Sequence, residues 1–143
     1  MNLLLQSMLE AHPAGAGANI TIIADALETL AISEQVCAAC ADACLAEEAP
    51  EHLRDCIRIN LNCAAVCSAT ARLLVNHHAS AAGVLHAQLH ACILSCQACA
   101  DICATHAEQH EHCAICAETC RRCQEKCNVA LAEISPAGVV QSV

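Results

Sequence analysis

Cysteine thiols are the reactive groups that dominate this sequence, and their spacing is regular. Between Cys92 and Cys127 they recur at steps of three and four residues, with a single ten-residue gap. Positions three or four apart lie on one face of an α-helix, because the helix repeats about every 3.6 residues. Each row of thiols is therefore predicted to form a stripe on one helix face. The fifteen cysteines fall into four rows, which are Cys37, Cys40 and Cys44; Cys56, Cys63 and Cys67; Cys92, Cys96, Cys99 and Cys103; and Cys113, Cys116, Cys120, Cys123 and Cys127.

Many of these thiols form pairs with the spacing C-x-x-x-C, such as Cys40 with Cys44 and Cys123 with Cys127. The Cβ atoms of such a pair should lie roughly 5 to 6 Å apart on a helix, so that two sulfurs can close on a metal ion between them. A disulfide needs a shorter Cβ separation, about 3.8 Å. Soft thiolates favour Cu(I), zinc and iron–sulfur clusters. The spacing therefore indicates metal binding rather than cross-linking.

Electrical charge separates these candidate metals. A buried zinc ion with four thiolates has a net charge of about −2, and several such sites in one core would repel one another strongly. With thiolates that bridge neighbouring ions, one Cu(I) per cysteine leaves no net charge. We therefore expect a protein that binds and stores many Cu(I) ions. A zinc or iron–sulfur protein with few tetrahedral sites remains the alternative, whereas a thiol redox enzyme would need the alternating strands and helices that this sequence lacks.

Some polar residues lie in or near the cysteine rows. Asn60 occupies the missing step of the second row, and a buried amide needs hydrogen bonds or a metal, since an unsatisfied one costs roughly 1 to 3 kcal/mol. His106 and His110 nearly continue the third row, and imidazole is an acceptable copper ligand. These two histidines are either ligands or solvated residues at helix ends, and His52 and His112 are expected to be solvated. The candidate metal ligands are thus all fifteen cysteines together with His106, His110 and Asn60.

The cysteine rows also predict the fold that positions them. We expect helices over about 19–48, 50–78, 83–105 and 111–134, with a turn between Thr105 and Glu111. The cysteines lie in the second half of the first and third helices and in the first half of the second and fourth. Short connections make consecutive helices antiparallel, which brings all the sulfur to one end and the Leu and Ile side chains to the other.

The predicted fold class is therefore all-α: an antiparallel up-down-up-down four-helix bundle with a cysteine-lined core, plus a short N-terminal helix. We divide the chain into an N-terminal segment and linker at 1–17, a metal-storage bundle at 18–134 and a C-terminal tail at 135–143.

Composition limits the other functions that the chain could have. The formal net charge is −9 and only six residues are Lys or Arg, which excludes a nucleic-acid partner. The N-terminus lacks the basic region of a secretory signal, and no run of about eighteen apolar residues predicts a membrane span. We therefore expect a cytoplasmic protein, where thiols stay reduced. No catalytic triad, phosphate-binding loop or carboxylate pair emerges, so we do not expect an enzyme.

Cysteine-rich helices with repeated C-x-x-x-C and C-x-x-C pairs, such as Cys37 with Cys40, resemble the cytosolic branch of the four-helix-bundle copper storage proteins, the Csp family. The resemblance covers roughly residues 19–134. It implies storage of many Cu(I) ions in the core, access through one end of the bundle and assembly into a homotetramer. It also supports histidines near that end as the first ligands. The partners it implies are copper ions, further copies of the chain and a protein that donates or accepts copper.

Overall fold

The computed structural model describes residues 3–15, 17, 19–78 and 82–134. Across these residues the regular secondary structure consists of helices, without a strand. The elements in chain order are α1 (Leu3–Glu10), α2 (Ile20–Leu45), the short 3-10 helix η1 (Pro50–Leu53), α3 (Arg54–Val75), α4 (Ala82–Ala104) and α5 (Glu111–Ile134). The predicted C-terminal tail, 135–143, lies outside the described residues.

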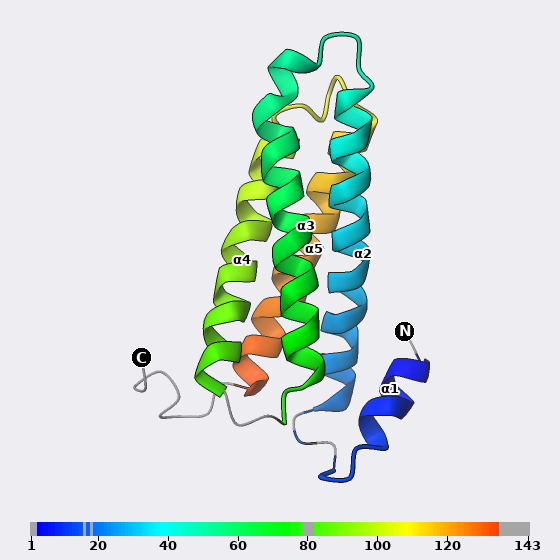
Figure 1. Cartoon of the computed structure of the whole chain (residues 1–143), viewed down its shortest axis with the longest axis vertical. Helices are drawn as coiled ribbons and strands as arrows, with labels where there is room; N and C mark the ends of the chain where they lie inside the picture. Colours follow the sequence, from blue (N-terminus) through cyan, green and yellow to red (C-terminus); the bar gives the residue numbers. More distant parts are fainter. Residues whose placement is uncertain (1–2, 16, 18, 79–81, 135–143) are drawn as a thin grey trace.

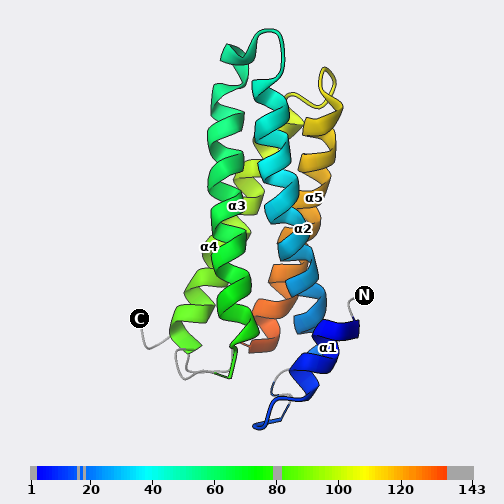
Figure 2. The same ribbon diagram turned by 45° about the vertical axis from the view of Figure 1, so that its right-hand side comes forward.

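The four long helices lie side by side and run alternately up and down, as Figure 1 and the turned view in Figure 2 show. Helix α2 packs against α3 and α5, and α4 packs against the same two helices from the other side. The short α1 lies outside this bundle, against the first part of α2. The arrangement confirms the predicted antiparallel four-helix bundle with an additional N-terminal helix.

Helix α2 begins where Asn19 supplies a cap. The Asn19 side-chain Oδ1 accepts hydrogen bonds from the backbone N–H groups of Thr21 and Ile22, at 3.1 and 3.4 Å. Such a cap satisfies donors that have no partner inside the helix. The backbone N–H of Asn19 donates to Glu133 Oε1 at 3.0 Å. This contact ties the start of α2 to the last turn of α5.

The turn between α4 and α5 spans residues 105–110, where the sequence predicts a break. The Thr105 hydroxyl donates to the Ile102 carbonyl at 2.6 Å, and the His106 N–H donates to the Cys103 carbonyl at 3.0 Å. These bonds use carbonyl groups at the end of α4 that have no partner within the helix. The chain therefore reverses direction here although residues 105–110 contain neither Gly nor Pro.

The core changes its chemistry along the bundle. At the end where α2 and α4 begin, Ile23, Leu30, Leu74 and Leu89 are fully buried, and we call this the aliphatic end. The cysteines occupy the other part of the core, toward the turn at 105–110. This separation confirms the predicted alternation of aliphatic and sulfur halves.

Two small polar side chains, Ser33 and Thr70, are buried among the core residues. The Thr70 hydroxyl donates to the Val66 carbonyl at 2.6 Å and accepts from Gln88 Nε2 at 3.0 Å. Ser33 Oγ is fully buried and has no hydrogen-bond partner among the described residues.

In the described part of the chain, no helix combines the length and the apolar character that crossing a bilayer requires.

Candidate metal centre

All fifteen cysteines lie in the described residues, and all are free thiols buried in the core. None exposes more than 1% of its surface, the largest value belonging to Cys40. The stripes occupy the inward faces of four antiparallel helices, so that each helix supplies sulfur to a common interior. Free thiols gathered in this way become a set of soft ligands once they lose their protons.

The sulfur atoms form groups stacked along the bundle. The ligand atoms of each group lie within 4.8 Å of one another. We name them by their position: the inner group is Cys67, Cys92, Cys96 and Cys123; the middle group is Cys37, Cys63, Cys99 and Cys120; the upper group is Cys40, Cys103 and Cys116; and the outer group is Cys40, Cys44, His112 and Cys113. Because Cys40 belongs to both of the last two groups, the stack is continuous there.

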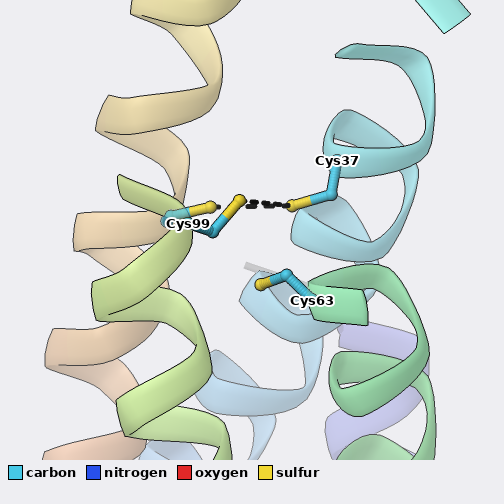
Figure 3. Close-up of side chains that lie close together, drawn as sticks. Cys37, Cys63 and Cys99 are labelled. Carbon is cyan, nitrogen blue, oxygen red and sulfur yellow. Dashed lines mark hydrogen bonds between the residues drawn. The ribbon is translucent and has the colours of Figure 1, made fainter. Parts of the chain in front are cut away.

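The middle group shows how closely the sulfurs approach. Cys37 Sγ lies 3.6 Å from Cys120 Sγ and 3.9 Å from Cys99 Sγ. In Figure 3 the side chains of Cys37, Cys63 and Cys99 point toward one another from three helices. At a metal–sulfur distance of about 2.3 Å, two sulfurs on one ion lie no more than about 4.6 Å apart. The observed separations are therefore short enough for neighbouring thiolates to share a metal ion.

The remaining cysteines, Cys56 and Cys127, extend the stack. Cys56 Sγ lies 3.7 Å from Cys103 Sγ in the upper group. The pKa of Cys127 is raised by its interaction with Cys123 and then with Cys92, both members of the inner group. All fifteen predicted cysteines therefore line one connected core.

Asn60 is fully buried between these groups. Its Oδ1 accepts from Cys116 Sγ at 2.9 Å and from Cys99 Sγ at 3.3 Å. Its Nδ2 donates to the Cys56 carbonyl at 2.8 Å and to Cys103 Sγ at 3.3 Å. The expected requirement for partners is met by the sulfur core itself. Once these thiols lose their protons, Asn60 Oδ1 no longer receives their hydrogen bonds and is free to bind a metal ion.

Burial and mutual interactions shift the pKa values of the thiols. Burial is the largest cause that raises the pKa of Cys113, to about 11. The pKa of Cys56 is raised, first by Cys103, whereas that of Cys103 is lowered, first by Cys116. Neighbouring sulfurs are thus linked by hydrogen bonds, in which one sulfur keeps its proton and donates it to the other. Because metals bind thiolates, an incoming ion must displace these protons.

His112 belongs to the outer group, contrary to the expectation that it is a solvated residue at a helix end. Its Nδ1 lies 3.5 Å from the sulfurs of both Cys40 and Cys113, and 4.0 Å from that of Cys44. The sequence contains a signal for this position, because His112 precedes Cys116 by four residues and so lies on the cysteine face of α5.

The other histidines of this end lie farther from the sulfurs. His110 Nδ1 and His112 Nε2 approach the same atom, Glu47 Oε2, at 3.1 and 2.9 Å. The His52 ring lies 6.0 Å from that of His106 and 5.9 Å from that of His110, measured between centroids. We call the end of the bundle that carries His52, His106, His110 and His112 the histidine end. The His110 ring lies 5.4 Å from that of His112, and neither His106 nor His110 belongs to the outer group.

Sequence reasoning missed Glu47 altogether. This residue follows α2, and its N–H donates to the Cys44 carbonyl at 3.3 Å. The pKa of its carboxyl is lowered, chiefly by the hydrogen bond with His112. No regular spacing connects Glu47 with the cysteines, and the two residues it contacts, His110 and His112, are more than 60 positions away in the sequence. An ionised carboxylate beside two imidazoles is therefore a feature that the structure alone provides.

Comparison with solved structures identifies close relatives of this fold. The copper storage protein Ccsp from Streptomyces lividans, loaded with ten copper equivalents, is 43% identical and superposes with a TM-score of 0.87. That comparison covers 90% of this chain and 98% of the other. A second structure, of the cytosolic copper storage protein from Streptomyces lividans with five coppers, is 46% identical with a TM-score of 0.76, over 78% of this chain and 93% of the other.

Sequence comparisons agree with the structural ones. The uncharacterized cysteine-rich protein YhjQ from Bacillus subtilis is 32% identical over 93 residues, which is 65% of this chain and 81% of that protein. The family model described as copper storage protein matches residues 21–132. This chain therefore belongs to the copper storage protein family, which confirms the function predicted from its cysteines.

Proposed function

We propose that this protein stores many Cu(I) ions as thiolates in the core of its bundle, with all fifteen cysteines as ligands. The observation that carries the proposal is the continuous stack of buried, unpaired thiols from four helices. Thiolates that bridge neighbouring ions keep the stack close to electrical neutrality when the ions are univalent. A dry core would strongly oppose the accumulated negative charge of several zinc tetrathiolates.

We assign additional ligands to the polar groups that face the sulfurs. Asn60 Oδ1 contacts two thiols of the stack, so it is positioned to complete a copper site where its row lacks a cysteine. His112 Nδ1 faces the thiols of the outer group and is the imidazole best placed to bind Cu(I). His106 and His110 lie outside the outer group, and we assign them as earlier ligands on the way to the stack.

Copper would reach the core through the histidine end. Fully buried aliphatic side chains fill the core at the other end, and they offer no ligand to an incoming ion. The storage domain corresponds to residues 18–134, preceded by the N-terminal segment at 1–17 and followed by the tail at 135–143. Release to a protein that accepts copper would use the same end.

The family relationship supports further properties. We propose a cytoplasmic location, as in the Streptomyces lividans protein described as cytosolic, together with assembly into a homotetramer and the absence of an enzymatic activity.

One surface depression between α2 and α5 is lined by Ile32 and Ile115, which are 50% and 51% exposed. A contact with another copy would cover such side chains. Light scattering coupled to size-exclusion chromatography measures the number of subunits.

The experiment that tests storage is a titration of the fully reduced protein with Cu(I), followed by metal analysis of the desalted product. We expect uptake on the order of one ion per cysteine. Saturation at three or four ions would reject storage and favour the alternative, a zinc or iron–sulfur protein with few tetrahedral sites. As a control, the same protein with its thiols alkylated in denaturant should bind almost no copper, because its soft ligands are blocked.

A further inference from the structure

One carboxylate oxygen holds two histidines at the histidine end of the bundle. Glu47 Oε2 lies 2.9 Å from Nε2 of His112 and 3.1 Å from Nδ1 of His110. An ionised carboxylate can only accept hydrogen bonds. Both ring nitrogens that face it must therefore carry a hydrogen atom. The two rings are stacked, with their centroids 5.4 Å apart, so that each also restricts the rotation of the other.

This arrangement determines which nitrogen of His112 can bind copper. A neutral imidazole carries one N–H and one lone pair. With the hydrogen on Nε2 held by Glu47, the lone pair is on Nδ1. That atom lies 3.5 Å from the sulfurs of Cys40 and Cys113. The ring thus presents its metal-binding nitrogen to the outer group.

The position of the carboxylate supports the same conclusion. Glu47 Oε2 and the thiols of the outer group contact opposite nitrogens of the same ring. Among the described residues, the Glu47 side chain makes no hydrogen bond to a cysteine. Carboxylates that accept the second N–H of a metal-binding histidine fix the tautomer and the orientation of the ring. Loss of such a partner typically lowers metal affinity or activity about 10- to 100-fold.

We propose that Glu47 is a positioning residue for copper uptake, which holds His112 with Nδ1 directed at the outer thiols. It acts through the histidine and does not itself bind the ion. The inference rests on the proposed storage of Cu(I) and deepens it, because it names the residue that prepares the first sulfur-containing site for an incoming ion.

The test compares Glu47→Ala with Glu48→Ala, which removes the neighbouring exposed carboxylate at the same end of the bundle. Cu(I) is delivered from a chromophoric chelator and its transfer is followed by stopped-flow absorbance. We expect Glu47→Ala to slow the first phase of transfer about tenfold or more, and Glu48→Ala to leave the rate within about twofold of the original. The final copper content should not change, because all the cysteines remain.

Three further experiments separate positioning from a general loss of structure. The ring nitrogens of ¹⁵N-labelled histidine report the tautomer, and His112 should show a protonated Nε2 in the original protein and a mixture of tautomers in Glu47→Ala. Glu47→Asp, which keeps a carboxylate, should recover part of the rate. In a His112→Ala background the Glu47 substitution should have little further effect, because the ring through which it acts is absent.

An unchanged transfer rate and an unchanged His112 spectrum in Glu47→Ala would overturn the inference. Equal slowing by Glu48→Ala would overturn it as well, since the effect would then be one of surface charge. These outcomes differ from failure of the storage proposal, in which the original protein itself would take up only a few ions.

Discussion

Cys37 and Cys120 are separated by 83 positions in the sequence, yet their sulfur atoms lie 3.6 Å apart in the core. They come from α2 and α5, two antiparallel neighbours in the bundle. Contacts of this kind convert stripes on single helices into a shared set of ligands. Each cysteine of the middle group should therefore matter to more than one stored ion.

Replacement of Cys120 by Ala tests this sharing. Because a bridging thiolate serves more than one ion, we expect the copper capacity to fall by one to two ions rather than by a fraction of one. Metal analysis after saturation with Cu(I) under reducing conditions measures the change. Glu118→Ala, which alters an exposed residue of the same helix, is the matched control and should keep the original capacity. A capacity unaffected by Cys120→Ala would contradict the shared core.

Ser33 offers the opposite test, in which a ligand is added. It lies on the inward face of α2, one turn before Cys37, and is fully buried. Ser33→Cys should raise the copper capacity by about one ion, since a thiol at this position extends the α2 stripe toward the inner group. Gln35→Cys places a thiol on the exposed side of the same helix and should add no ion that survives a competing chelator.

The same serine carries an energetic prediction. A buried hydroxyl without a partner costs about 1 to 3 kcal/mol, and Ser33 Oγ has no hydrogen-bond partner among the described residues. Ser33→Ala should therefore increase the free energy of unfolding of the metal-free protein, by about 1 kcal/mol or more. Chemical denaturation under reducing conditions measures it. A destabilised variant would mean that the hydroxyl has an effective partner.

Copper binding should depend on pH because the thiols hold their protons. Burial raises the pKa of Cys113 to about 11, so this group is protonated at neutral pH and must release its proton to bind a metal. Because the pKa is raised, protons compete with copper for this sulfur at every pH below that pKa. Apparent affinity should therefore fall as the pH is lowered, by about tenfold per pH unit for each proton displaced.

Competition with a chelator whose own protonation is corrected for measures this dependence. Proton release can be followed in parallel with an indicator dye in weak buffer. Cys113→Ser, whose hydroxyl stays protonated, should release fewer protons at saturation. Copper uptake with no release of protons at neutral pH would show that the thiols are already ionised.

The aliphatic end should contribute to stability without affecting copper capacity. Leu74 is fully buried among the aliphatic residues, and substitution of such a leucine by alanine typically costs about 2 to 5 kcal/mol. Leu74→Ala should unfold at a clearly lower temperature, whereas Leu73→Ala, at a position that is 37% exposed, should change little. Saturation with Cu(I) should raise the melting temperature of both variants, since a ligand that binds the folded state stabilises it.

Metal analysis of the folded Leu74→Ala protein provides the second readout. An unchanged copper content would show that the two halves of the core have separate roles. A lower content would mean that the aliphatic residues also set the geometry of the sulfur stack.

The cysteine rows predicted the fold well because their spacing carries both the helix period and the direction of each helix. The aliphatic half and the sulfur half exchange their order from one helix to the next, and together with the short connections this order predicts the antiparallel arrangement. That a buried Asn60 needs hydrogen bonds or a metal followed from its place in a cysteine row, whereas the identity of its partners came from the structure. What the pattern could not provide was Glu47, which lies in a turn and meets His112 across 65 positions of sequence. Contacts between loops and distant helices have no periodic signal.

His112 shows a different limit. Its distance of four residues from Cys116 was visible in the sequence, but its position at the start of a helix favoured a solvated side chain. The structure places Glu47 on one side of the ring and the thiols on the other, which accounts for its partial burial, with 25% of the side chain exposed. A residue at a helix end can therefore face the core when a neighbouring turn covers it.

The asymmetry of the bundle has a consequence for the order in which ions would be withdrawn. Leu30 and Leu74 are fully buried at the far end of the sulfur column, so an ion held beside Cys127 has other occupied sites between itself and the exterior. Ions near the histidine end would therefore leave first, and those bound deepest in the core would exchange slowest.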